Sequence, residues 1–170
     1  SHPLRGRVDM RRADAIEPAQ QHGNCPRVVA EPVAGSFEQA QFRAAVAADP
    51  GLTLARVNLA LALLLSDDLP GAEKEARAAA QALPDSPSAQ HVLGLVRRAQ
   101  NEGAGAQAAF RRVLDLDPGD VAARVFLAQL LLAERQAELA VELLRVAVER
   151  EPWNATATYA LGQARLRLDQ

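Results

Sequence analysis

Apolar side chains recur every three or four residues through most of this chain, which is the spacing of amphipathic helices. Residues 121–154 show the pattern clearly, as two apolar stretches separated by the polar residues 134–136. The apolar positions are Val125, Leu127, Leu130 and Leu131 in the first stretch and Ala140, Leu143, Leu144, Ala147 and Val148 in the second. Pro152 ends the second stretch, because proline neither donates to the helical ladder nor continues the helix. The segment predicts two antiparallel helices.

The same pattern returns along the chain with a constant 34-residue period. A leucine followed by a small residue marks each return: Leu59-Ala60, Leu93-Gly94, Leu127-Ala128 and Leu161-Gly162. A proline closes each interval at the same step: Pro50, Pro84, Pro118 and Pro152. A fixed period of this length indicates an array of stacked units, each of which buries its apolar surface against its neighbours.

These markers divide the chain into a leader, residues 1–35, and an array, residues 36–170. Within the array we expect a half-unit at 36–52, units at 53–86, 87–120 and 121–154, and a terminal helix at 155–168, about eight helices in all. Ser36 opens a capping-box pattern, so the first helix is expected to run from there to about Asp49. Ser86, Asp120 and Asn154 precede later helices and are expected to cap them.

The leader differs from the array. Proline and glycine interrupt every helical window of useful length, at Pro3, Gly6, Pro18, Gly23, Pro26, Pro32 and Gly35. Residues 28–33 are apolar, and the neighbouring prolines favour an extended conformation. We expect a flexible leader that is partly extended, and we also consider that residues 28–33 pack on the array.

The repeat resembles the tetratricopeptide repeat. That family's pattern places leucine and a small residue in the first helix of a unit, then alanine, a large residue and alanine in the second, and a closing proline. Residues of this chain that match in the second helices include Ala106, Phe110, Val113 and Pro118, and Ala140, Leu144, Ala147 and Pro152. The resemblance implies an all-α fold, a right-handed α-solenoid of antiparallel helix pairs.

Some positions depart from the family pattern. Glu38 stands where alanine is expected, and Ala76 stands where a large residue is expected. An aromatic position early in the first helix holds Arg56, Gln90, Arg124 and Thr158. These polar replacements suggest looser packing within the units.

In the family, one face of the first helices lines a concave groove that binds ligands. The matching positions of this chain are Asn58, Leu61, His91, Leu95, Arg98, Val125, Phe126, Gln129, Tyr159 and Gln163. Some family members hold a terminal carboxylate with basic residues on this face, but the corresponding positions here are Val57, Ala122 and Phe126. The resemblance therefore implies a protein or peptide segment as partner, mainly apolar, with Leu95, Phe126 and Gln129 at the centre of the site.

Composition supports the helical interpretation and narrows the partners. Alanine and leucine dominate an apolar fraction of 49%, aromatic residues make up only 4%, and the formal net charge is −2. This charge gives no reason to expect nucleic acid or an anionic membrane as partner. The longest apolar run, residues 59–65, is too short to span a bilayer. Cys25 is the one cysteine, which fits a reducing cytoplasm without excluding a secreted protein, so the compartment stays open.

No constellation for catalysis is evident in the sequence. His22 and Cys25 form a pair separated by two residues, but a zinc site needs further ligands and none lies nearby. Residues 103–105 form a small-residue turn between helices, so they do not indicate a phosphate loop. We expect no catalytic residue, no metal site and no cofactor.

Three functional interpretations follow. The first is a non-catalytic scaffold that binds a protein segment in its groove. The second is a self-assembly scaffold, in which the array ends or the leader join copies into a homo-oligomer. The third is the recognition arm of a larger enzyme. The family resemblance does not decide this alternative, because function belongs to sites and not to folds.

Overall fold

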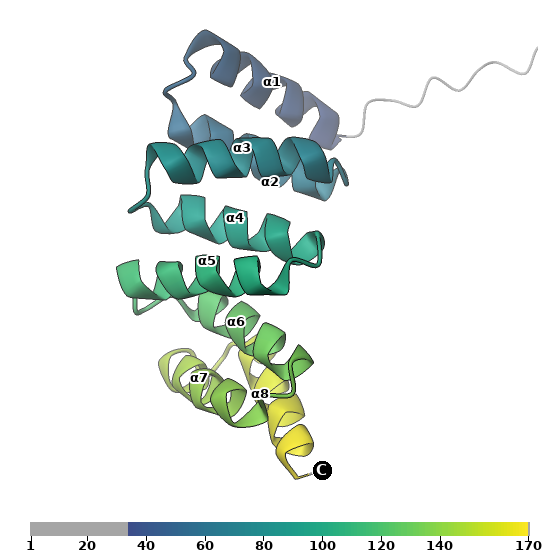
Figure 1. The fold of residues 1–170 in the computed structure, drawn as a ribbon, viewed down its shortest axis with the longest axis vertical. Coiled ribbons are helices and arrows are strands. Elements are labelled where there is room, and N and C mark those ends of the chain that lie inside the picture. Colours follow the sequence, from purple (N-terminus) through teal and green to yellow (C-terminus); the bar gives the residue numbers. More distant parts are fainter. Residues whose placement is uncertain (1–33, 170) are drawn as a thin grey trace, which may run out of the picture. The chain divides into compact units, whose positions relative to one another are not determined.

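A computed structural model describes residues 34–169, and these contain eight α-helices and no strand (Figure 1). The helices are α1 (Ala34–Ala48), α2 (Thr53–Leu65), α3 (Leu69–Ala82), α4 (Pro87–Ala99), α5 (Gly103–Leu116), α6 (Val121–Ala133), α7 (Ala137–Arg150) and α8 (Ala155–Leu168). The expectation of an all-α repeat fold is confirmed. None of these helices has both the length and the apolar character needed to cross a membrane.

Each helix packs on the next in the chain, and the first helices of neighbouring units also touch. The pairs α2–α3, α4–α5 and α6–α7 are the expected units, while α2 contacts α4 and α6 contacts α8. Helix α1 lies at one end of the array and α8 at the other (Figure 1). We call α2, α4, α6 and α8 the first helices, and α1, α3, α5 and α7 the second helices.

Side-chain caps mark where three of the four first helices, α4, α6 and α8, begin. Ser86 accepts a hydrogen bond from the amide of Ala89, Asp120 from that of Ala123, and Asn154 from that of Ala157, at 3.4, 2.7 and 3.0 Å. Each bond satisfies an amide that has no partner within its own helix. The three predicted caps are confirmed.

The expected cap of the first helix is wrong, because Ser36 lies inside α1, whose described residues are Ala34–Ala48. The predicted packing of residues 28–33 on the array lies outside the residues that the structure describes, and it stays a prediction.

The turns inside the units repeat as closely as the helices do. Asp67, Asn101 and Arg135 follow one another at the step of the repeat, and all three have a positive φ, between 61° and 63°. A left-handed residue lets the chain reverse direction between two packed helices, and Asp and Asn adopt this conformation more readily than Arg.

The core is made of small side chains that allow helices to approach closely. The leucines of the recurring pairs are all buried, and Ala60 and Ala128 are fully so. At Gly94 the approach is closer still, since a Cβ atom there would lie 2.8 Å from Cε1 of Phe110. Phe110 of α5 is fully buried over this glycine, so the small residue of one helix accommodates the large residue of the next.

The polar residues at the family's early aromatic position have a structural role. The side chains of Arg56, Gln90 and Arg124 donate to the carbonyl oxygens of Pro50, Pro84 and Pro118, at 2.9, 3.1 and 2.7 Å. The same hydrogen bond therefore ties each unit to the closing proline of the preceding one. Arg56 also pairs with the buried Glu75 at 2.7 Å. At these positions, where the sequence suggested looser packing within the units, side-chain hydrogen bonds link each unit to the preceding one.

Candidate functional site

Four of the ten predicted groove residues meet between α4 and α6. The His91 ring lies 5.7 Å from that of Phe126, edge to face, and the guanidinium of Arg98 lies over the Phe126 ring at 4.4 Å. Arg98 also donates to Oε1 of Gln129 at 3.3 Å. We call His91, Arg98, Phe126 and Gln129 the central cluster. Its side chains connect two first helices that are not neighbours in the chain.

Phe110 packs against two members of the central cluster, His91 and Phe126. Its ring stacks on Phe126 at 5.4 Å with an interplanar angle of 23°, and His91 contacts it edge to face at 5.5 Å. Such aromatic pairs add about 0.5–1.5 kcal/mol beyond the burial of their area. Phe110 packs directly on Gly94 of α4, and Phe126 stacks on Phe110. The glycine therefore determines how close the Phe126 ring lies to α4. All the cluster residues are half-buried, while Phe110 is fully buried.

Charges surround the central cluster on two sides. Burial lowers the pKa of Arg98 from its ordinary value, yet the group stays charged near neutral pH. Asp120 caps α6 with one carboxylate oxygen, and the other lies 3.8 Å from Nδ1 of His91. That distance is too long for a hydrogen bond, and the carboxylate attracts the imidazole electrostatically only when His91 is protonated. Any ligand at the cluster therefore meets an aromatic surface with a cation beside it.

Burial disfavours the protonated form of His91. Burial lowers the pKa of His91 below 6.5, the nearby charge of Arg98 lowers it further, and Asp120 partly opposes the shift. The folded protein binds the His91 proton less tightly than the unfolded chain does. The stability of the fold therefore rises with pH between the folded pKa of His91 and 6.5. The contribution is complete above pH 6.5 and is lost as the pH falls through the folded pKa.

We therefore expect wild type to lose more thermal stability than His91→Phe when the pH falls from about 7.5 to about 5.5. Phenylalanine keeps an aromatic contact with Phe110 and Phe126 but cannot bind a proton. Melting temperatures of both proteins across this range give the measurement, and carboxylate titrations cancel in the comparison. Equal losses in the two proteins would contradict the assigned role of His91.

The other six predicted residues fall into three groups. Val125 is only 4% exposed and packs in the core, so it offers no surface to a ligand and we remove it from the site. Leu95 is half-buried and packs against the same core cluster. Asn58 and Leu61 lie on α2, and Tyr159 and Gln163 lie on α8, where the Gln163 amide donates to the Tyr159 hydroxyl at 2.9 Å.

The sequence did not indicate every residue that contributes to the candidate site. Phe110 matched the family's large-residue position, but its contact with Phe126 depends on how two different helices, α5 and α6, pack together. Leu65 was also not predicted, although it is 81% exposed at the end of α2. The available signal was a leucine at a position where the equivalent residues are Ala99, Ala133 and Arg167.

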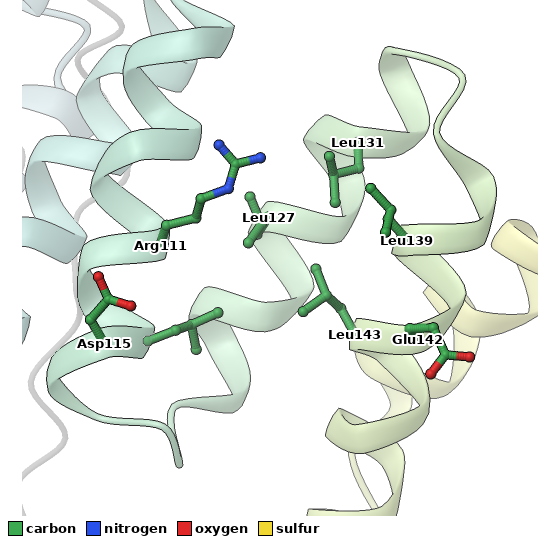
Figure 2. A pocket seen from close by; sticks show the side chains of 8 residues that line it. Arg111, Asp115, Leu127, Leu131, Leu139, Glu142 and Leu143 are labelled. Carbon is green, nitrogen blue, oxygen red and sulfur yellow. The ribbon is translucent and has the colours of Figure 1, made fainter.

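An apolar cleft occurs on the opposite side of α6. It has a volume of about 480 Å³ and lies between α5 and α7, with Leu127 and Leu131 of α6 at its floor (Figure 2). Leu139 and Leu143 form one wall, and Arg111 and Asp115 stand on the other. We call it the outer cleft. It shares no residue with the central cluster.

The outer cleft recurs two repeats earlier in the array. A second cleft is lined by residues at the corresponding repeat positions: Arg43, Val46, Ala47, Leu59, Leu63, Gly71, Lys74 and Glu75. In the unit between them, Arg97 occupies the position of Leu63 and Leu131. Its side chain lies against Gly105 and donates to the carbonyl oxygen of that glycine at 3.4 Å. Both clefts lie between neighbouring second helices. In the unit between them, the Arg97 side chain fills the corresponding space.

Two family models of the tetratricopeptide repeat match the sequence, over residues 33–87 and 97–148. Together they cover more than half of the chain. The chain belongs to the tetratricopeptide repeat family. Among curated protein sequences, none matches it.

Solved structures of tetratricopeptide repeat proteins share the fold. A crystal structure of MamA aligns with a TM-score of 0.70 and 16% identity, over 81% of this chain and 85% of that one. TTC0263 of Thermus thermophilus aligns with a TM-score of 0.67 and 21% identity, over 75% of this chain and 71% of that one. The first repeat domain of Spaghetti (RPAP3), bound to the HSP90 peptide SRMEEVD, aligns with a TM-score of 0.67 and 17% identity, over 69% of this chain and 94% of that one. Identities this low show the fold alone.

Membership of the family supports a protein-interaction scaffold as the general role of the chain. Among residues 34–169, no group of three or more histidine, cysteine, aspartate or glutamate side chains is arranged to hold a metal ion. His22 and Cys25 lie outside that range. The candidate site is therefore the central cluster together with the first-helix residues around it.

Proposed function

We propose that this protein is a non-catalytic scaffold that binds a protein segment along the exposed face of its first helices. The observation that carries the proposal is a row of exposed apolar side chains on the helices that flank the central cluster. Leu54, Leu61 and Leu65 lie on α2, and Tyr159 lies on α8. Large exposed apolar groups that cluster on one surface mark interaction sites more often than single ones do.

The central cluster supplies the polar part of the proposed site. Arg98 and Gln129 can donate hydrogen bonds to the carbonyl groups of an extended or helical segment. Phe126 offers a ring that is already held by Phe110 and Arg98, so little side-chain entropy is lost when a ligand covers it. An apolar segment with regularly spaced large side chains fits this arrangement of anchors.

The lining favours an apolar segment over an acidic one. The peptide bound by the Spaghetti domain carries two glutamates and an aspartate. A comparable peptide would need several cations on the first helices, whereas the positions that correspond to such cations here hold Val57, Ala122 and Phe126. Arg98 is the cation of the central cluster, and its guanidinium already lies over an aromatic ring.

The test begins with selection of binding peptides from a displayed random library against the whole chain. We expect the selected peptides to carry spaced apolar side chains, and we expect Phe126→Ala to weaken their binding by about 1–2 kcal/mol, or roughly five- to thirtyfold in Kd. The affinity should change little between low and high salt, because salt screens exposed charge pairs and leaves apolar burial intact. Fluorescence anisotropy with a labelled peptide measures both effects.

Leu139→Ala is the matched control, since it removes a half-exposed leucine from the outer cleft on the opposite side of the array. Its affinity for the peptides should equal that of wild type. Peptides that respond to Leu139→Ala and not to Phe126→Ala would place the site on the outer cleft instead. Melting curves of both variants separate lost binding from lost stability.

A further inference from the structure

The outer cleft carries leucines that the equivalent surfaces of the preceding units lack. Leu139 and Leu143 of α7 form one of its walls, and Leu139 is 54% exposed. The equivalent positions of the two preceding units hold residues that are small or charged: Gly71, Glu75, Gly105 and Ala109. Large apolar side chains gathered on one surface mark an interaction site more often than single ones do. The proposed peptide site on the first helices does not account for this surface.

Two opposite charges lie at opposite corners of the outer cleft. Arg111 stands on the α5 wall and Glu142 on the α7 wall, and Figure 2 shows them diagonally across the cleft with the leucines between them. Arg111 is exposed, donates to Oε1 of Gln107 at 2.9 Å, and forms no salt bridge within the described part of the chain. The Glu142 side chain is 67% exposed and pairs with Arg145 of its own helix at 3.2 Å. Both charges are therefore accessible to a partner at the mouth of the cleft.

The outer cleft is complementary to itself. A two-fold axis through the middle of the cleft turns the α7 wall of one copy onto the α5 wall of another, and an isologous contact requires such self-complementarity. Because Arg111 and Glu142 lie at opposite corners, this rotation brings Glu142 of each copy next to Arg111 of the other. It also turns Leu139 of each copy toward Leu114, which lines the cleft from α5. Charges and apolar groups therefore match in the same orientation.

We propose that the outer cleft is a docking surface for a second copy of this chain, and that two copies form a symmetric dimer through it. The leucines of each α7 enter the cleft of the other copy, and Arg111 pairs with Glu142 twice, once at each side. Burial of the exposed leucines supplies most of the affinity, and the two charge pairs fix the orientation. A contact of this symmetry closes on itself, so assembly stops at the dimer.

The second cleft of the array provides an internal comparison. It is lined by residues at the same repeat positions, but Lys74 stands at the position of Glu142, and Arg43 at that of Arg111. A two-fold axis through this cleft would bring Lys74 of one copy next to Arg43 of another, and like charges in such a contact repel. Of these two clefts, the outer cleft alone combines the shape with charges that match their own copies. This difference favours a second copy as its occupant.

Dimerisation is independent of the proposed peptide binding. The outer cleft shares no residue with the central cluster and lies on the opposite side of α6. The two proposals are therefore tested by separate measurements, and either can fail without the other.

The test is sedimentation equilibrium of the whole 170-residue chain over a range of micromolar concentrations. We expect the average mass to rise from 18.2 kDa to a plateau at twice that value. Arg111→Glu and Glu142→Arg should each weaken dimerisation by at least about tenfold, because each substitution places like charges together at both sides of the contact. Leu139→Ala should weaken dimerisation by about five- to tenfold, since it removes apolar area from the contact twice.

The double variant Arg111→Glu, Glu142→Arg gives the sharpest outcome. It reverses both members of each charge pair, so its dimerisation should return to within about threefold of wild type. Glu102→Arg is the matched control, since it makes the same charge change at an exposed residue before α5, outside the cleft, and it should dimerise like wild type. Circular dichroism and melting curves show whether each variant is folded.

Four results would overturn the proposal. The first is a wild type that stays monomeric throughout, and the second is a wild type that grows beyond the dimer. The third is a folded single charge variant that dimerises like wild type, and the fourth is a folded double variant that stays as weak as the single ones. If a charge reversal prevents folding, Leu139→Ala decides instead, because unchanged dimerisation of that variant also contradicts the proposed contact.

Discussion

Replacing Phe110 by alanine should lower the free energy of unfolding by about 3–5 kcal/mol. Phe110 is the largest fully buried side chain of the described array, and it contacts His91, Phe126 and the bare backbone at Gly94. Its removal leaves a cavity that the neighbouring helices cannot close, because α4 already lies at contact distance. Chemical denaturation followed by circular dichroism measures the change.

The same substitution should also broaden the denaturation curve. The buried apolar residues form two clusters, one within residues 57–96 and the other within residues 106–164. Phe110 belongs to the second cluster and packs on Gly94 of α4, so it links the two. In a repeat protein, stability depends on such nearest-neighbour contacts, and a weakened contact lets the two sides unfold separately.

Phe42→Ala is the matched control, since it removes the same side chain at the same repeat position from the end of the array. Phe42 is half-buried, so its loss should cost clearly less and leave the curve sharp. Equal costs for the two substitutions would show that the burial of Phe110 over Gly94 contributes nothing special.

Much of the fold could be predicted from the sequence, because weak indications of helix pairs recur at the same step in every unit. A single leucine–small pair is compatible with any helix, but four at one step, in phase with prolines and caps, leave a helix-pair array as the consistent solution. The start of α1 could not be predicted as well, since one capping pattern at Ser36 had no repeat to support it. Ser36 lies inside the helix instead.

The candidate site was only partly predictable, because burial within a face depends on neighbouring side chains. Val125 and Phe126 are adjacent in sequence and both were expected in the groove, yet Val125 is buried and Phe126 is half-buried on the ring of Phe110. Likewise, Asp120 was recognised as a helix cap, but its second oxygen near His91 depends on how α4 and α6 are placed.

Polar departures from the repeat pattern were the hardest to interpret. Arg56, Gln90 and Arg124 replace an aromatic residue, which suggested looser packing. Their carbonyl partners are the closing prolines of the preceding unit, whose backbone oxygens have no helical partner of their own. The substitution exchanges apolar contact for a hydrogen bond at the same joint. Thr158 is too short for this role and donates to Asn154 instead.

The second large effect concerns Gly94, where alanine should destabilise the protein by about 1–2 kcal/mol. A Cβ atom there would lie 2.8 and 2.9 Å from two ring carbons of Phe110, and overpacking of a buried site costs about 1–3 kcal/mol. Alanine is a better helix former than glycine by about 0.5–1 kcal/mol, which offsets only part of that cost. Chemical denaturation at neutral pH measures the net change.

Gly162→Ala is the matched control at the same repeat position. Because nothing lies within 4 Å of its added methyl group, only the helix-forming preference remains, and stability should rise by about 0.5–1 kcal/mol. The two substitutions are chemically identical, so opposite signs would isolate the contact with Phe110. Gains at both sites would mean that Phe110 shifts aside without cost.

A double substitution completes the argument. Gly94→Ala combined with Phe110→Leu recreates in the unit 87–120 the pair formed by Ala128 and Leu144, both of which are fully buried in the next unit. The smaller side chain of leucine leaves room for the added methyl group, so the double variant should be more stable than the sum of the single losses predicts, by about 1 kcal/mol or more. Strict additivity would show that residues 94 and 110 do not constrain each other. Positive coupling would show that the small and the large residue of a unit depend on each other. Glycine would then be required at position 94 because α5 carries phenylalanine at position 110.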